Sequence, residues 1–216
     1  MKTMKITKKK IFVAAIAVCL VAILSFGTLA WFTATDEVEN VFKVSTDSQT
    51  QKPDFKLDLF EHQANEDGKL SNTEVDTNTY DNVAPGDVLY KDPTVRNDGQ
   101  YDMWVRVKVT LNDYDKWQAV LGTSYDFRNI LGSVSTDWSF DTIETDATAK
   151  TLTLVYYKDA KLAVGGTSTL FTSVNVPSDF TVDNMPTEFN LDIVAEAIQF
   201  DNTGNSAKAA FANYWN

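Results

Sequence analysis

The chain has 216 residues, of which 44% are hydrophobic and 23% are charged, so a globular domain is expected and a wholly disordered chain is excluded. The formal net charge is −11, although the first 30 residues contain only basic charges. The rest is therefore strongly acidic, and we expect neither nucleic acid nor anionic headgroups as partners. The single cysteine, Cys19, lies in the N-terminal apolar run, so the chain beyond residue 30 forms no disulfide.

Residues 1–30 have the pattern of a secretory signal peptide. Three lysines (8–10) precede the apolar run 11–24, and Thr28 and Ala30 are the small residues of a cleavage site before Trp31. An uncleaved anchor is the alternative, because residues 11–32 are long enough to span a bilayer. A membrane would then be contacted only through the uncleaved precursor. Both interpretations place the rest of the chain outside the cell.

The first half of the remaining chain predicts strands separated by polar stretches. Residues 31–44 form a candidate strand, residues 45–54 a polar linker and residues 55–60 a second strand. Residues 61–82 are expected to be an exposed loop or an insertion. Pro85, Gly86 and Asp87 predict a tight turn, and a strand should follow it through Val95.

Asp98 and Gly99 are typical of a hairpin with a type I′ turn. The next strand, 103–111, is the clearest in the chain, because apolar residues alternate along it. A short helix is expected near residues 114–121, and further strands at 138–140, 151–157, 170–176 and 189–199. Ser206 is a candidate N-cap of a helix that ends near Trp215.

This element order, with no βαβ alternation, predicts an all-β antiparallel sandwich with short helices. The expected organisation is a signal peptide (1–30), an N-terminal strand and linker (31–54), the sandwich (55–200) and a short C-terminal helix (201–216).

Three segments resemble the TasA/camelysin family of Gram-positive bacteria. They are the junction at residues 27–36 with the following Val38-Glu39-Asn40-Val41-Phe42, the Pro-Gly-Asp turn with the Asn-Asp-Gly sequence, and the closing stretch at residues 195–199. The resemblance implies a jelly-roll sandwich and processing by a dedicated, endoplasmic-reticulum-type signal peptidase. It also implies fibres in the extracellular biofilm matrix, with other matrix proteins as candidate partners. The chain departs from the better-known fibre formers in its length and its aromatic C-terminal helix.

The segment released by cleavage is a candidate polymerisation strand. An extended strand can add to the open edge of a neighbouring sheet, and a head-to-tail contact of this kind gives a filament. The residues expected to carry the contact are Trp31, Phe32, Val38, Asn40, Phe42 and Val44. The alternatives are that residues 31–44 form the first strand of their own sandwich, or a frayed terminus.

The sequence contains no recognisable catalytic motif, and we predict that the protein is not an enzyme. His62 is the only histidine, so the clustered histidines typical of zinc proteases are missing. His62 is expected to be a solvated loop residue. A camelysin-like surface metalloprotease is the alternative, and it would depend on carboxylates alone.

No cofactor is predicted, although calcium is the best candidate, through oxygen ligands. These ligands would be Asp76, Asp81, Asp87 and Asp92, or separately Asn112, Asp113 and Asp115. A third hypothesis is a monomeric adhesion or binding module. Its contact platform would consist of Tyr101, Trp104, Trp117 and Trp138. For Trp104, however, we expect a place in the core or against the terminal helix.

Overall fold

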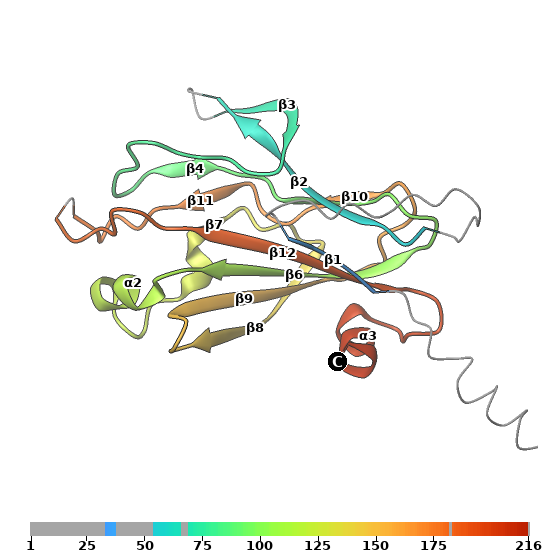
Figure 1. Cartoon of the computed structure of the whole chain (residues 1–216). Coiled ribbons are helices and arrows are strands. Elements are labelled where there is room, and N and C mark those ends of the chain that lie inside the picture. The colour runs from blue at the N-terminus through green and yellow to red at the C-terminus, as the bar shows by residue number, and fades with distance from the viewer. Residues whose placement is uncertain (1–32, 38–53, 66–68, 182, 216) are drawn as a thin grey trace, which may run out of the picture. The chain divides into compact units, whose positions relative to one another are not determined.

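The computed structural model describes residues 33–37, 54–65, 69–181 and 183–215, which belong to one compact unit (Figure 1). These residues form three antiparallel sheets. The five-stranded sheet has the order β1 (Thr33–Glu37), β12 (Leu191–Gln199), β6 (Met103–Leu111), β9 (Thr151–Lys158) and β8 (Trp138–Asp146). The four-stranded sheet has the order β10 (Thr167–Thr169), β5 (Thr94–Asn97), β2 (Leu57–Ala64) and β3 (Leu70–Val75). The three-stranded sheet consists of β4 (Val88–Tyr90), β11 (Ser173–Asn175) and β7 (Leu131–Gly132).

The predicted all-β class is confirmed. The five-stranded sheet forms one layer, and the two smaller sheets lie over it as the second layer (Figure 1). Helices α2 (Tyr114–Leu121) and α3 (Ala207–Tyr214), with the short 3-10 helix η1 (Phe127–Ile130), are the described helices. Both α-helices lie where the sequence predicts them.

The main core fills the space between the layers. The central strand β6 contributes its alternating apolar residues from Met103 to Leu111, all of them at most 1% exposed. The second layer contributes Leu59 and Val95 from the four-stranded sheet and Val174 from the three-stranded sheet. The period-two pattern in the sequence therefore identifies the core face of β6 correctly.

A second, smaller core lies on the outer face of the five-stranded sheet. Helix α3 packs there through Phe211 against Trp104 of β6 and Ile198 of β12. The Ser206 hydroxyl accepts a hydrogen bond from the N–H of Ala209 at 3.3 Å, as an N-cap does. The expected places of Trp104 and Ser206 are both confirmed.

The Pro85-Gly86-Asp87 turn is also confirmed. The N–H of Asp87 donates to the carbonyl of Ala84 at 3.1 Å, and Gly86 has a φ of 87°. A positive φ at this position is the reason that the turn takes glycine.

The prediction of a hairpin at Asp98-Gly99 is wrong. β5 and β6, which flank it, belong to different sheets, so the segment carries the chain from one layer to the other. Type I′ turns need positive φ at both central residues, and neither Asp98 nor Gly99 has one. Gly99 instead permits a close approach of two backbones, because a Cβ there would lie 2.8 Å from the carbonyl oxygen of Asp54.

Two further expectations are wrong. The 61–82 stretch is not only a loop, because β2 continues to Ala64 and forms a hairpin with β3. The strand expected to run through Val95 is broken at Lys91-Asp92-Pro93, and its halves, β4 and β5, join different sheets. Proline cannot donate to a ladder, which is consistent with a break at this point.

Candidate assembly edge

β1 forms one edge of the five-stranded sheet. It pairs antiparallel with β12, from Thr33 opposite Ile198 to Glu37 opposite Val194. This pairing within one chain corresponds to the alternative in which the N-terminal segment is a strand of its own sandwich. The expected cleavage residues Thr28, Ala30 and Trp31 lie outside the described residues. The polymerisation residues Phe32, Val38, Asn40, Phe42 and Val44 also lie outside them.

β12 presents an apolar edge to β1. Ile193, Ala195, Ala197 and Ile198 are all at most 3% exposed, and Glu196 is the only charged residue between Ile193 and Ile198. A strand edge without a partner exposes its N–H and C=O groups, and natural edges are usually protected by charges, prolines or bulges. β12 has little of this protection, so it needs a covering strand.

The buried carboxylate of Glu196 in β12 is balanced by basic side chains of the neighbouring strand β6. Its carboxylate forms an ion pair with Arg106 of β6, and Lys108 Nζ lies 3.7 Å from its other oxygen. The Arg106 guanidinium lies 4.3 Å from the centre of the Phe211 ring in α3. The terminal helix therefore covers an ion pair whose carboxylate residue is directly opposite Thr35 of β1.

β8, at the opposite edge of the same sheet, has the protection that β12 lacks. Glu144 and Asp146 are exposed, and Asp141 forms an ion pair with Lys208. The register shifts between Phe140 and Thr142, which marks a bulge or irregularity. The N–H groups of Ala149 and Thr148 donate to the Asp146 carboxyl and hold its pKa below the usual value. This edge therefore resists strand addition.

The second layer contains a polar cluster that the sequence did not predict. Glu61 is 1% exposed and forms an ion pair with Lys91, while its second oxygen accepts from Asn78 Nδ2 at 2.9 Å. His62 lies on β2, where its Nδ1 is 2.6 Å from Asp92 Oδ2. The expectation of a solvated loop histidine is therefore wrong. These contacts join β2 to the 76–94 segment.

The candidate calcium ligands are not brought together. No group of three His, Cys, Asp or Glu residues that could hold a metal ion occurs in the part of the chain that the structure describes. Several of the aspartates instead contact the protein itself. Asp87 accepts from the N–H of Ala84, Asp92 contacts His62, and Asp113 and Asp115 pair with Lys116 and Lys150.

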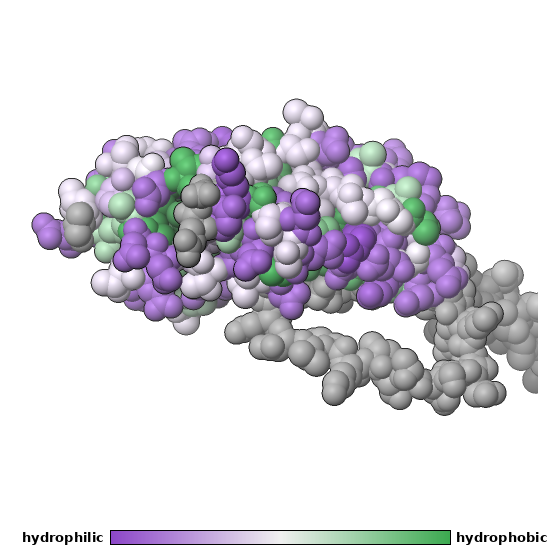
Figure 2. All heavy atoms as spheres, turned by 90° about the horizontal axis from the view of Figure 1, so that it is seen from above, coloured by the Kyte–Doolittle hydropathy of each residue, from purple (hydrophilic) through white to green (hydrophobic). Residues whose placement is uncertain are grey.

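The tryptophans form no exposed platform, so that expectation is wrong. Trp104, Trp117 and Trp138 are at most 5% exposed. The Trp138 indole N–H donates a hydrogen bond to the Ser168 hydroxyl at 3.0 Å. The face of the second layer that Figure 2 shows is mainly hydrophilic. Within the described residues, no helix has the length and hydropathy needed to cross a membrane.

A pocket of about 580 Å³ lies beside the first residues of β12. Its apolar lining includes Val83, Leu89, Val174, Phe189 and Leu191, of which only Val174 is fully buried. Asp81, Glu188 and Asp192 are exposed acidic residues of its lining. The lining comes from four separate stretches of the chain, which explains why no sequence motif indicated the pocket.

No family model, curated protein or solved structure matches the chain. The resemblance to the TasA/camelysin family therefore stays a prediction from the sequence motifs. The strongest structural feature that bears on function is the difference between the two edges of the five-stranded sheet.

Proposed function

We propose that the chain is an exported structural protein of the bacterial cell surface or biofilm matrix. It assembles into fibres when its N-terminal strand moves to the β12 edge of a neighbouring subunit after cleavage before Trp31. The observation that carries the proposal is the position of β1. It begins at Thr33, two residues after the expected new N-terminus, and covers the less protected edge of the sheet.

Strand exchange would replace each contact of β1 with the same contact in a neighbour. Exchange of identical elements between copies is a low-cost route to assembly, because the donor and acceptor surfaces already match. Residues 38–53 connect β1 to the described segment that starts at Asp54. Fully extended, this connection reaches at most about 60 Å, which is enough to span to a second subunit.

The direction of growth follows from the two edges. Each subunit would donate one strand and accept one strand at β12, and this head-to-tail contact does not close on itself. The acidic residues of β8 disfavour addition at the other edge of the sheet. A linear fibre is therefore expected rather than a branched aggregate.

Cleavage is the natural switch for this assembly. The precursor would keep its N-terminal segment in the membrane, so β1 would become free to exchange only outside the cell. The partners that follow are the dedicated signal peptidase, further copies of this chain and other matrix proteins with a matching strand. A Gram-positive cell surface is the compartment that the junction motif favours.

Electron microscopy of two purified versions tests the proposal. The chain that starts at Trp31 should form filaments, and the chain that starts at Ser45 should not, since it lacks the donor strand. Circular dichroism should show nearly the same β-sheet spectrum for both, because strands β2 to β12 are present in each version. Filaments from both versions, or monomers from both, would sink the proposal.

A synthetic peptide of residues 31–44 supplies the matched control. It should bind the version that starts at Ser45 and raise its melting temperature by a few degrees, since it restores the edge strand. It should produce no filaments, because the peptide has no domain attached to carry the next edge. A peptide with the same composition in scrambled order should do neither.

A further inference from the structure

The polar cluster of the second layer places a carboxylate on the core face of a strand. Leu57, Leu59 and Glu61 alternate along β2 and are all at most 5% exposed, so Glu61 takes a position that the pattern assigns to an apolar side chain. A charge in such a place is costly unless it is paired and hydrogen-bonded. Even a paired charge stabilises a fold weakly compared with an apolar replacement. The buried carboxylate therefore calls for a chemical explanation.

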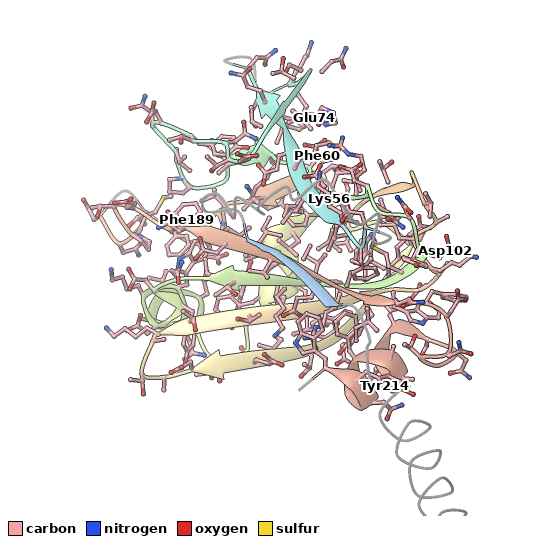
Figure 3. All side chains as sticks on the ribbon, turned by 45° about the vertical axis from the view of Figure 1, so that its right-hand side comes forward. Lys56, Phe60, Glu74, Asp102, Phe189 and Tyr214 are labelled. Carbon is pink, nitrogen blue, oxygen red and sulfur yellow. The ribbon has the colours of Figure 1, made fainter. Side chains whose placement is uncertain are left out.

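Glu61 holds an amine and an amide on its two oxygens. One oxygen forms an ion pair with Lys91, which is 9% exposed, and the other accepts a hydrogen bond from Asn78 Nδ2 at 2.9 Å. Lys91 directly follows β4, and Asn78 lies three residues after the end of β3. Both side chains also line the pocket beside β12. The strand pair β2–β3, next to which the cluster lies, can be found in Figure 3 by its labelled residues Phe60 and Glu74.

The Asn78 amide is held in one orientation by three hydrogen bonds. Besides the contact with Glu61, its Nδ2 donates to the carbonyl of His62 at 3.0 Å, and its Oδ1 accepts from the N–H of Ala64 at 2.8 Å. Exchange of the oxygen and the nitrogen would set donor against donor or acceptor against acceptor at each contact. A backbone N–H aimed at a carbonyl oxygen stabilises negative charge that develops there, as an oxyanion hole does. The carbon of this amide is therefore activated toward a nucleophile.

We infer that Lys91 and Asn78 condense to form an amide bond between their side chains, with Glu61 as the acid–base catalyst. Within the buried pair, the Lys91 ammonium passes one proton to Glu61, which leaves a neutral amine and a neutral acid where burial disfavours charge. The flexible lysine stem then carries Nζ from Glu61 to the amide carbon of Asn78. This inference is independent of fibre formation and goes beyond it, because it assigns a covalent modification to the domain itself.

The reaction needs no oxidant, reductant or added reactant. The lone pair of Lys91 Nζ forms a bond to Asn78 Cγ, and the π electrons of the carbonyl move to Oδ1, beside the N–H of Ala64. Glu61 gives its proton to Asn78 Nδ2 and takes a second proton from Lys91 Nζ. The bond from Cγ to Nδ2 then breaks with its electron pair, the carbonyl forms again, and ammonia leaves. Ammonia takes the last proton from Glu61, so the products are a side-chain amide, a carboxylate and ammonium.

The bond would connect two sheets of the second layer. β3 belongs to the four-stranded sheet and β4 to the three-stranded sheet, so a link from residue 78 to residue 91 ties the ends of two successive strands together. A cross-link that closes a loop restricts the unfolded chain and thereby stabilises the folded one. The chain beyond residue 30 has no cysteine, so this amide would take the place that a disulfide has in many exported domains.

Peptide mass spectrometry of the purified protein, denatured and digested with trypsin, tests for the bond. Trypsin cleaves after lysine and arginine, and between residues 69 and 96 these are Lys69, Lys91 and Arg96. An amide on Lys91 blocks cleavage there, so the expected product is peptide 70–96, lighter than its sequence mass by one ammonia. Peptides 70–91 and 92–96 at their full masses would overturn the inference. Loss of ammonia from a peptide that still ends at Lys91 would indicate a different reaction of an asparagine, and would overturn it too.

Three substitutions assign the roles in this reaction. Lys91→Arg keeps the positive charge beside Glu61 without the amine nucleophile, and Glu61→Gln keeps the size of the catalyst without its proton exchange. Each should reduce the cross-linked fraction at least tenfold. Asn72→Ala, the matched control at an exposed position of the same peptide, should leave this fraction unchanged. An undiminished cross-link in Glu61→Gln would overturn the role of Glu61. The digest of the unmodified chain decides whether the bond exists, even if a variant fails to fold.

Discussion

The two edges of the five-stranded sheet differ in how each is protected. β12 has buried aliphatic residues and two charged ones: Asp192 is exposed near its start, and Glu196 is paired with Arg106 beneath a helix. β8 has exposed acidic side chains and an irregular register. The first edge needs a covering strand, and the second discourages one. The two edges of one sheet therefore differ in protection, and in the proposed fibre this difference would give the assembly its direction.

The largest expected effect concerns the ion pairs behind the two edges. Arg106→Met should lower the free energy of unfolding by about 3 kcal/mol, because it leaves the Glu196 carboxylate buried without its main partner. The melting temperature should fall by about 6–12 °C in a domain of this size.

The matched change at the other edge is Asp141→Asn, which removes the ion pair with the exposed Lys208. It should cost much less stability than Arg106→Met, because solvent screens an ion pair with an exposed lysine. Calorimetry of both variants measures the difference. Equal losses would show that the two edges are supported to the same extent and would contradict the comparison.

An intermediate effect is expected from removal of the charges on β8. The combination Asp141→Thr with Glu144→Thr, in the chain that starts at Ser45, should create a second edge able to pair. Self-association should then begin at about a tenfold lower concentration, as measured by sedimentation. Asp179→Thr with Asp183→Thr removes the same charge from exposed loop positions and serves as the control. If both pairs of substitutions promote association equally, net charge rather than the edge is responsible.

The smallest effect is expected at Asp146, at the end of β8. The N–H groups of Ala149 and Thr148 hold the pKa of its carboxyl below the usual value. A carboxyl with a lowered pKa in the folded state stabilises the fold above its unfolded pKa, near 3.9. This contribution disappears as the pH falls through the folded pKa.

Asp146→Asn should therefore lower the urea midpoint slightly at neutral pH, with a difference from the unmodified chain that shrinks below about pH 3. Urea titrations at both pH values measure it. A difference that grows on acidification would contradict the assignment of the turn hydrogen bonds.

Local patterns in the sequence predicted the elements whose causes are local. The alternation along residues 103–111 identified β6 and its buried face, and Ser206 identified the start of α3. The turn at Gly86 was predictable from the Pro85-Gly86 pair, because proline presets one backbone angle of the turn and glycine accepts the positive φ that follows. In each case the deciding interactions lie within a few positions in the chain.

Features that depend on distant partners were missed or wrongly predicted. Asp98-Gly99 has a hairpin sequence, yet the backbone at Asp54 and Lys56 decides its conformation. His62 lies in a polar stretch, yet its partner, Asp92, is 30 positions away. The pocket and the unequal edges arise from strand order, which the periodicity of single strands does not encode.

The close approach of Gly99 to the backbone near Asp54 has a mechanical consequence. The N–H groups of Asp98 and Gln100 hold the carbonyls of Lys56 and Asp54, which fixes the point where the N-terminal connection enters the second layer. In a fibre built as proposed, tension would pass from the exchanged strand through this connection to that point. The strand would be loaded in shear along β12, so its ladder bonds would resist together. The fibre would then yield first at the β12 pairing and leave the domain itself folded.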